Sequence, residues 1–132
     1  MKRRHLIALA AATTLSTMPQ AFAQSAGYPN RPIKLVVPFP AGISPDVVAR
    51  LIGDKLGAAL GQPVVVDNKP GANSIIGVDA VAKSAPDGHT FAVVIAAYAA
   101  NTTLYPKLPY DPLKDLVPVA LVSSSPIVMA AP

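Results

Sequence analysis

The sequence contains no cysteine, and its seven acidic residues are all aspartate. The lack of cysteine excludes disulfide bonds, thiolate chemistry and cysteine-based metal sites. Histidine is scarce as well: only His5 and His89 are present, and His5 lies in a segment that we expect to be removed. A site built on two histidines of one chain is therefore excluded, and we expect neither a metal nor a cofactor.

Common enzyme signatures are also absent. There is no Gly-x-Gly-x-x-Gly after the first expected strand, no phosphate-binding loop and no Gly-x-Ser-x-Gly elbow. Ser44, Asp87 and His89 could in principle form a hydrolytic triad, but nothing places Ser44 on the strained turn that such a serine requires. We expect no catalytic residues, and a secreted hydrolase is kept as the weaker alternative.

The amino terminus has the features of a secretory signal peptide. A basic start at residues 2–4 precedes a largely apolar stretch from Leu6 to Leu15, and Ala21-Phe22-Ala23 fits a cleavage site. The apolar run is shorter than the roughly 20 residues of a membrane span. Residues 1–23 are therefore expected to direct export, and residues 24–132 to form the mature chain.

Removal of this segment nearly neutralises the chain. Three of the 11 basic residues leave with it and all seven acids stay, so the balance is near +1 (8 minus 7). The remaining lysines and arginines are scattered along the sequence. We therefore expect no nucleic-acid partner.

The mature chain alternates between expected strands and helices. Ser44 is the expected N-cap of a first helix with Pro45 in its first turn, and this helix is expected to end at Gly61. Asn73 or Ser74 is expected to cap a second helix that ends before the turn Pro86-Asp87-Gly88. The first helix carries an apolar stripe of Val48, Ile52, Leu56 and Leu60, widened by Leu51 and Ala59, and the second carries Ile75, Ile76, Val78, Val81 and Ala82.

Short apolar runs before, between and after these helices predict strands. The run Val64–Val66 is apolar throughout, so we expect a buried parallel strand. A helical turn is expected near Asn101–Tyr105. The other predicted strands are Ile33–Val37, Thr90–Ala96, Val117–Val122 and Ile127–Ala130. The order β-α-β-α-β predicts an α/β fold with a parallel sheet and helices on both faces.

Ligands of open parallel sheets bind beyond the carboxyl ends of the strands. Loops Pro38–Asp46, Pro70–Ser74 and Ala97–Thr103 are expected there. Small residues before two helix starts suit an anion that is held by main-chain N–H groups, although ordinary strand-to-helix turns have the same pattern. Asp46 is more simply a partner of the helix dipole than a ligand contact.

Aromatic residues and histidine near these loops leave alternatives open. Phe39 and Tyr98 could belong to the core or to the wall of a cleft. His89 is most simply an exposed turn residue. The candidate ligand-binding residues are Phe39, Pro40, Ala41, Gly42, Ile43, Ser44, Asp46, Asn73, Ser74, Ile75, Ala97, Tyr98 and Asn101.

Several motifs are spaced along the whole expected mature chain. They are Tyr28-Pro29-x-Arg31-Pro32-Ile33, Val36-Val37-Pro38-Phe39-Pro40-x-Gly42-x-x-x-Asp46-x-x-Ala49-Arg50, Leu60-Gly61-Gln62-x-Val64-Val65-Val66-x-Asn68, Pro70-Gly71-Ala72 with Ile76-Gly77, Pro86-Asp87-Gly88-x-Thr90 and Leu108-Pro109-Tyr110-Asp111-Pro112. Together they resemble the Bug family, the periplasmic receptors of tripartite tricarboxylate transporters.

This resemblance implies a type II periplasmic-binding-protein fold, in which two lobes close over a carboxylate-bearing solute. It implies a periplasmic monomer that delivers its ligand to membrane permease subunits. In the family, the loops that correspond to Phe39–Asp46 and Asn73–Ile75 hold a ligand carboxylate through main-chain amides and ordered water. The chain departs from the family at Ile43 and at Asn73 or Ser74, where glycine is usual.

Length is the larger departure, because family members continue well beyond the equivalent of Pro132. The resemblance therefore implies that residues 24–132 form the incomplete first lobe of a two-lobed receptor. A truncated, non-functional fragment of such a receptor is the alternative that this leaves open.

Overall fold

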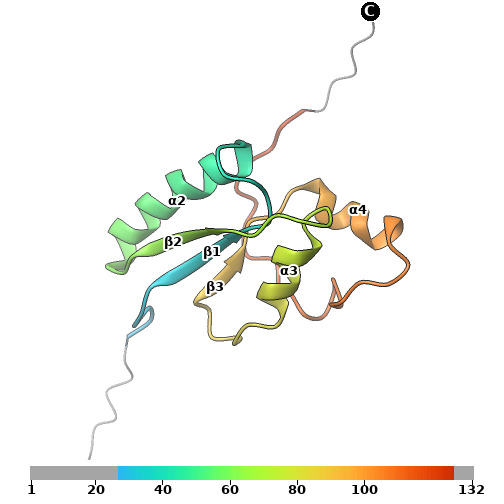
Figure 1. Ribbon diagram of the computed structural model, residues 1–132. Helices are drawn as coiled ribbons and strands as arrows, with labels where there is room; N and C mark the ends of the chain where they lie inside the picture. The colour runs from blue at the N-terminus through green and yellow to red at the C-terminus, as the bar shows by residue number, and fades with distance from the viewer. Residues whose placement is uncertain (1–26, 127–132) are drawn as a thin grey trace, which may run out of the picture.

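The computed structural model describes residues 27–126, so the expected signal peptide and the strand expected at Ile127–Ala130 lie outside the described residues. Six elements follow one another along the chain (Figure 1). They are β1 (Ile33–Val37), α2 (Ser44–Leu60), β2 (Val64–Asn68), α3 (Ile75–Ala82), β3 (Thr90–Ala92) and α4 (Ala96–Leu104).

The three strands form a parallel sheet in the order β2-β1-β3, with Leu35 of β1 opposite Val66 and Phe91. The first crossover leads from the central strand β1 to β2, and the second leads back from β2 past β1 to β3, so the two run in opposite directions across the sheet. Because crossovers between parallel strands are right-handed, this places α2 on one face of the sheet and α3 on the other, as Figure 1 shows. The predicted parallel α/β architecture is confirmed.

The core follows from the alternation of side chains along β1. Ile33, Leu35 and Val37 are buried on one face, where they cluster with Ala49 of α2. Val36 points to the other face and is also buried, as is Val78 of α3. The central strand is therefore covered on both sides, and it positions both helices relative to the sheet.

Helix α2 begins one residue earlier than predicted. Its N-cap is Ile43, with an extended backbone and no side-chain cap hydrogen bond, so Ser44 is the first helical residue and not the cap. The predicted end is confirmed, because Gly61 is left-handed (φ 68°) and donates its N–H to the carbonyl of Gly57.

The buried face of α2 is narrower than the predicted stripe. Asp46, Ala49 and Gly53 are its buried residues, whereas Leu51, Leu56 and Leu60 are exposed. A Cβ atom at Gly53 would lie 3.3 Å from Cγ1 of Val64, so this glycine lets the helix lie close to β2. Helix α2 approaches the sheet through its small residues Ala49 and Gly53, so its leucines point away from the sheet.

Strand β2 is not the buried strand that its sequence predicts. It is an edge strand of the described sheet, and Val65 is 50% exposed. Helix α2 covers one of its faces, while α3 packs against β1 and β3. An edge position leaves the apolar run half-buried because only one face has a neighbouring layer.

The third strand is shorter than predicted and the helix after it is longer. β3 ends at Ala92. The next residue makes one more bond to β1, in which the Val93 N–H donates to the carbonyl of Val36. Pairing stops there because β1 runs into Pro38, which has no N–H to donate. The prediction of a loop at Ala97–Thr103 is wrong, because this whole segment lies within helix α4.

The segment Val117–Val122 is not a strand among the described residues. Val117, Val119 and Leu121 are between 75% and 88% exposed. A strand needs a paired neighbour, and the described chain offers none here.

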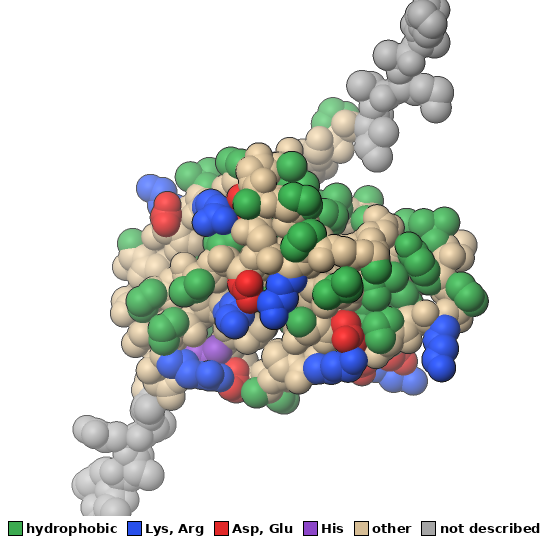
Figure 2. All heavy atoms as spheres, in the orientation of Figure 1, with side chains coloured by type: hydrophobic (Ala, Val, Ile, Leu, Met, Phe, Trp, Pro, Cys, Tyr) green, Lys and Arg blue, Asp and Glu red, His purple; other side chains and the backbone are tan. Residues whose placement is uncertain are grey.

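Figure 2 shows other hydrophobic side chains gathered on the surface near α4. No helix within residues 27–126 is long and apolar enough to cross a membrane.

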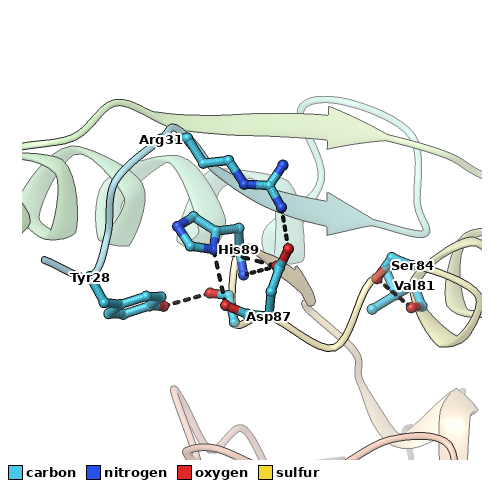
Figure 3. A network of polar contacts seen from close by, with 7 residues as sticks. Tyr28, Arg31, Val81, Ser84, Asp87 and His89 are labelled. Carbon is cyan, nitrogen blue, oxygen red and sulfur yellow. Dashed lines mark hydrogen bonds and ion pairs between the residues drawn. The ribbon is translucent and has the colours of Figure 1, made fainter. Parts of the chain in front are cut away.

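The amino end of the sheet carries a polar network (Figure 3). Asp87 pairs with Arg31 and accepts the main-chain N–H of His89 at 3.1 Å, and the pKa of Asp87 is lowered mainly by that N–H. His89 is only 6% exposed, with its ring edge-on to Tyr28 at 5.0 Å. The prediction of an exposed turn residue is therefore wrong for His89: its main-chain carbonyl accepts the N–H of Lys34 in β1, which draws it into the sheet.

Candidate functional site

The starts of α2 and α3 lie at the same edge of the sheet, beyond the carboxyl ends of β1 and β2. The Lys69 N–H donates to the carbonyl of Val37 at 2.8 Å, which joins the ends of the two strands. Gly77 in the first turn of α3 packs directly on Pro38, because a Cβ atom there would lie 2.6 Å from Cβ of Pro38. The structure thus brings together the two loops that the sequence predicts as an anion site.

The first loop, residues 38–43, is closed by Asp46, which is 2% exposed. The carboxylate of Asp46 accepts the N–H of Gly42 at 2.8 Å, Nε of Arg50 at 3.1 Å and Nδ2 of Asn68 at 2.9 Å. Asn68 Nδ2 also donates to the carbonyl of Phe39 at 3.2 Å. The loop is therefore tied to its own helix and to the end of β2.

These contacts lower the pKa of Asp46 to about 2, with the Arg50 hydrogen bond as the largest cause, followed by the Gly42 N–H and Asn68. Both carboxylate oxygens are engaged by groups of the chain itself. We therefore interpret Asp46 as an organiser of the loop, in addition to its place in the first turn of α2. Its negative charge is paired with the guanidinium of Arg50 at 3.0 Å.

The second loop, residues 71–74, has an uncommon backbone. Ala72, Asn73 and Ser74 have φ values of 45°, 50° and 77°, in the left-handed region that residues other than glycine rarely adopt. Ser74 occupies the N-cap position of α3 but makes no side-chain cap hydrogen bond. The prediction of Ser74 at the start of this helix is confirmed, and the expected capping bond is absent.

Asn101 of α4 connects the third predicted segment to this loop. Its side chain is fully buried, accepts Asn73 Nδ2 at 2.6 Å and donates to the main-chain carbonyl of Asn73 at 2.7 Å. Sequence reasoning had grouped Asn101 with the site but missed this pairing. No local pattern signals it, because the two asparagines are 28 residues apart.

Both helix starts present main-chain donors. Within residues 27–126, no hydrogen bond is donated by the N–H groups of Ser44, Ile76 or Gly77. The positive ends of the two helix dipoles add to this field. A carboxylate is the kind of group that such an edge can hold without a basic side chain.

The other candidate residues take different places. Residues 40–44 are exposed, and Phe39 is half-buried against the core. Ile43 has φ −89°, so it avoids the positive φ that Gly42 adopts at 88°. The positive φ that would exclude a β-branched residue is therefore confined to Gly42 in this loop.

Tyr98 and Ala97 lie in the first turn of α4, and Ile75 begins α3. The Tyr98 hydroxyl donates to the carbonyl of Pro112 at 2.6 Å, and its ring stacks on Tyr110 at 6.3 Å. Burial raises the pKa of Tyr98. These contacts direct Tyr98 toward residues 110–112 and not toward the two loops.

The structure does not assemble a hydrolytic triad. Ser44 lies beyond the carboxyl end of β1, while Asp87 and His89 lie at the amino end of the sheet (Figure 3). The five residues of β1 separate the two ends, a length of roughly 16 Å at 3.3 Å per residue. Ser44 therefore has no access to the imidazole of His89.

Two hollows in the described surface lie away from both loops. One, of about 560 Å³, is lined by Tyr105, Tyr110 and Asp115 among others beside the end of α4. Another, of about 470 Å³, lies at the end of α2. Within residues 27–126, no group of three or more histidine, cysteine or acidic residues could hold a metal ion.

Comparisons with known proteins point to one family. The family model described as "Tripartite tricarboxylate transporter family receptor" matches residues 48–132. Protein BugT of Bordetella pertussis is 50% identical over 104 residues, which cover 77% of this chain and 32% of BugT. The chain thus spans about a third of the length of that relative.

Solved structures give the same result. MatC from Rhodopseudomonas palustris with bound malate is 44% identical, with a TM-score of 0.68 over 72% of this chain and 33% of MatC. The periplasmic binding protein BugD is 40% identical, with a TM-score of 0.64 over 67% of this chain and 29% of BugD. These likenesses confirm the predicted fold as a portion of a periplasmic binding protein.

Proposed function

This chain belongs to the tripartite tricarboxylate transporter receptor family, and from that premise we propose that it binds a small dicarboxylate through the main-chain amides of two strand-to-helix loops. The family consists of substrate-binding receptors, in agreement with the prediction that the chain is not an enzyme. The ligand class is proposed by analogy with MatC, which is described with bound malate.

The observation that carries the proposal is the packing of the start of α3 against the loop that leads into α2, at one edge of the sheet. Gly77 of α3 packs on Pro38 of the first loop. The first-turn amides of Ser44, Ile76 and Gly77 donate no hydrogen bond within residues 27–126. Two helix starts at one edge of the sheet can act on one carboxylate, because their N–H groups and the positive ends of their dipoles face the same side of the sheet.

The negative charge bonded to the first loop is paired with a cation of the chain itself. The carboxylate of Asp46 is the nearest negative charge to the first loop, and it is paired with Arg50 at 3.0 Å. Amide donors also suit a transport receptor, since they give moderate and reversible affinity without a fixed ion pair. A second carboxylate of the ligand would reach beyond the two loops.

We further propose the cellular setting from the family and its relatives. Residues 1–23 would direct export, residues 24–132 would form the first lobe of a monomeric periplasmic receptor, and the receptor would pass its ligand to membrane permease subunits. In such a two-lobed receptor the described residues would form one wall of the cleft, so the chain tested alone should bind weakly. Solvent on the open side weakens each polar contact.

The experiment is a residue-resolved NMR titration of this chain with malate. We expect the amide signals of Ser44, Ile76 and Gly77 to move together, with those of Gly88 and His89 as internal controls at the opposite end of the sheet. Malamide, which lacks both carboxylates, should move none of them. Equal responses to malate and malamide would contradict the proposal.

A proline variant sharpens this test. Pro45 is the second helical residue of α2, and Ile76 is the second helical residue of α3. Ile76→Pro therefore removes one free N–H at a position where a helix tolerates proline. We expect malate binding to weaken about tenfold, as for the loss of one hydrogen bond to a charged group.

The matched control is Ile76→Ala, which shortens the same side chain and keeps the N–H. Ile76 is 55% exposed, so the control should fold normally. Equal binding by Ile76→Pro and the wild-type chain would remove this amide from the site.

A further inference from the structure

Asn101 is the polar residue most completely enclosed near the two loops. It is 0% exposed, and both ends of its side-chain amide face the loop before α3. Oδ1 accepts Asn73 Nδ2 at 2.6 Å, while Nδ2 donates to the main-chain carbonyl of Asn73 at 2.7 Å and lies 3.4 Å from Oγ of Ser74. The side chain of Asn101 thus binds both the side chain and the main chain of Asn73 in this loop.

The loop that Asn101 holds is unfavourable by itself. Three successive residues other than glycine, Ala72, Asn73 and Ser74, have positive φ. Left-handed residues of this kind normally occur singly. The Ser74 side chain supplies no cap hydrogen bond, so an interaction from outside the loop is needed to hold this backbone.

The bond to the Asn73 carbonyl also fixes the direction of the next donor. In a trans peptide unit the C=O and the following N–H point in opposite directions. Because the Asn73 carbonyl is turned toward Asn101, the N–H of Ser74 points away from α4. The side-chain amide of Asn101 supplies both the donor for this carbonyl and the acceptor for Asn73 Nδ2.

We propose that Asn101 is a positioning residue, which sets ligand affinity by holding residues 72–74 in the left-handed conformation that presents the first-turn amides of α3. The effect on ligand rests on the proposed carboxylate binding, whereas the effect on loop conformation does not. Asn101 itself touches no ligand in this scheme. Glycine would adopt positive φ at these positions without strain, whereas here the hydrogen bonds of Asn101 hold residues other than glycine in that conformation.

The first test uses two substitutions at Asn101. Asn101→Leu removes donor and acceptor at similar volume, and Asn101→Asp keeps an acceptor but loses the donor to the Asn73 carbonyl. The three-bond HN–Hα couplings of residues 72–74 report φ, and an NMR titration gives the Kd for malate. We expect both variants to change these couplings and to weaken malate binding about tenfold.

Thr103→Ala is the matched control on the same helix, since Thr103 is exposed. It should leave the couplings and the Kd unchanged. An Asn101→Leu variant that folds with wild-type couplings and wild-type affinity would overturn the proposal.

A rescue variant separates positioning from simple packing. In the wild-type background, Asn73→Gly removes the partner of a buried Asn101 oxygen, and malate binding should weaken. In the Asn101→Leu background the same change supplies glycine where φ is positive, and binding should recover by several fold. The same sign in both backgrounds would contradict a positioning role.

The two proposals fail in different ways. Absence of any malate response in the wild-type chain would reject the proposed function, while the couplings of residues 72–74 would still decide the role of Asn101. If Asn101→Leu does not fold, Asn101→Asp and the single Asn73→Gly variant give the same coupling readout.

Discussion

The two loops at the proposed ligand-binding edge do the same structural task with different chemistry. The loop before α2 is held by Asp46, a charged residue in the first turn of α2 and four positions after its partner Gly42. The loop before α3 is held by Asn101, a neutral residue 28 positions after Asn73 on another helix. One anchor is local and titrates, and the other is distant and does not.

Backbone conformation differs in the same way. The first loop needs a positive φ only at Gly42, whereas the second has three residues other than glycine in that region. A local anchor therefore goes with a relaxed backbone, and a distant anchor with a strained one. The comparison predicts that the two loops respond differently to substitution and to pH.

The largest expected effect removes the contact that the loops share. Gly77→Ala would place a Cβ atom 2.6 Å from Cβ and 2.9 Å from Cα of Pro38, and 2.8 Å from the carbonyl oxygen of Lys69. Two of these atoms belong to the backbone and cannot turn aside, so we expect a loss of about 3 kcal/mol in the free energy of unfolding. Urea unfolding measures it.

Gly27→Ala is the control for this variant, because nothing lies within 4 Å of the added atom. Gly77→Ala should also disturb the amide signals of both loops. Disturbance of only one loop would break the view that they share a wall at Pro38.

The next largest difference between the two loops should be their response to acid. Asp46 has a pKa of about 2 in the folded chain, against an ordinary aspartate value of 3.8. A lowered pKa stabilises the folded state above about pH 4, and this stabilisation is lost as the pH falls through about 2. The Gly42 amide should therefore lose protection from hydrogen exchange in that window, while the contacts of Asn101 do not titrate.

Asp87 and Asp111 also have lowered pKa values, mainly through the main-chain N–H groups of His89 and Leu113. Asp46→Asn is therefore the needed comparison, and it should remove the acid response of the first loop alone. An equal acid response of residues 72–74 would contradict the distinction between the two anchors.

A smaller effect is expected from Gly42→Ala. Nothing lies within 4 Å of the added Cβ atom, so the cost is only that of a left-handed alanine at φ 88°. We expect a loss of about 1–2 kcal/mol, measured by urea unfolding. A neutral result would mean that the first loop can take another backbone conformation.

The smallest effect has the opposite sign. Ala72→Gly relieves a left-handed residue in the second loop, where Ala72 is exposed with φ 45°. We expect a gain of about 0.5–1 kcal/mol, reduced by the greater freedom of glycine in the unfolded chain. A loss of stability here would argue that residues 72–74 carry less strain than their φ values indicate.

Much of the fold could be predicted because it depends on short-range patterns. The β-branched run Ile33–Val37, the proline in the first turn of α2 and the left-handed Gly61 act through neighbouring atoms. The order of strands and helices then predicted a parallel sheet. The starts of both helices were likewise predicted to within one residue, from Ser44 with Pro45 and from Asn73 or Ser74.

Errors arose where a neighbouring layer or strand decides the outcome. Val64–Val66 is apolar enough for a buried strand, yet β2 is at the edge of the described sheet. Thr90–Ala96 stops pairing at Ala92 because Pro38 ends its partner. His89 was expected to be exposed, but its carbonyl is drawn to Lys34 across the sheet.

The sequence by itself determined the alternation of strands and helices, the family, and the two loops that follow β1 and β2 at one edge of the sheet, since each depends on residues close together in the chain. Only the tertiary structure decided how those loops are held. Asp46 turned inward to Gly42 and Asn68, and Asn101 reached the loop from another helix. Such pairings depend on how the elements pack, because the hydrogen-bond partner of a buried polar side chain is set by the groups that surround it in the folded chain.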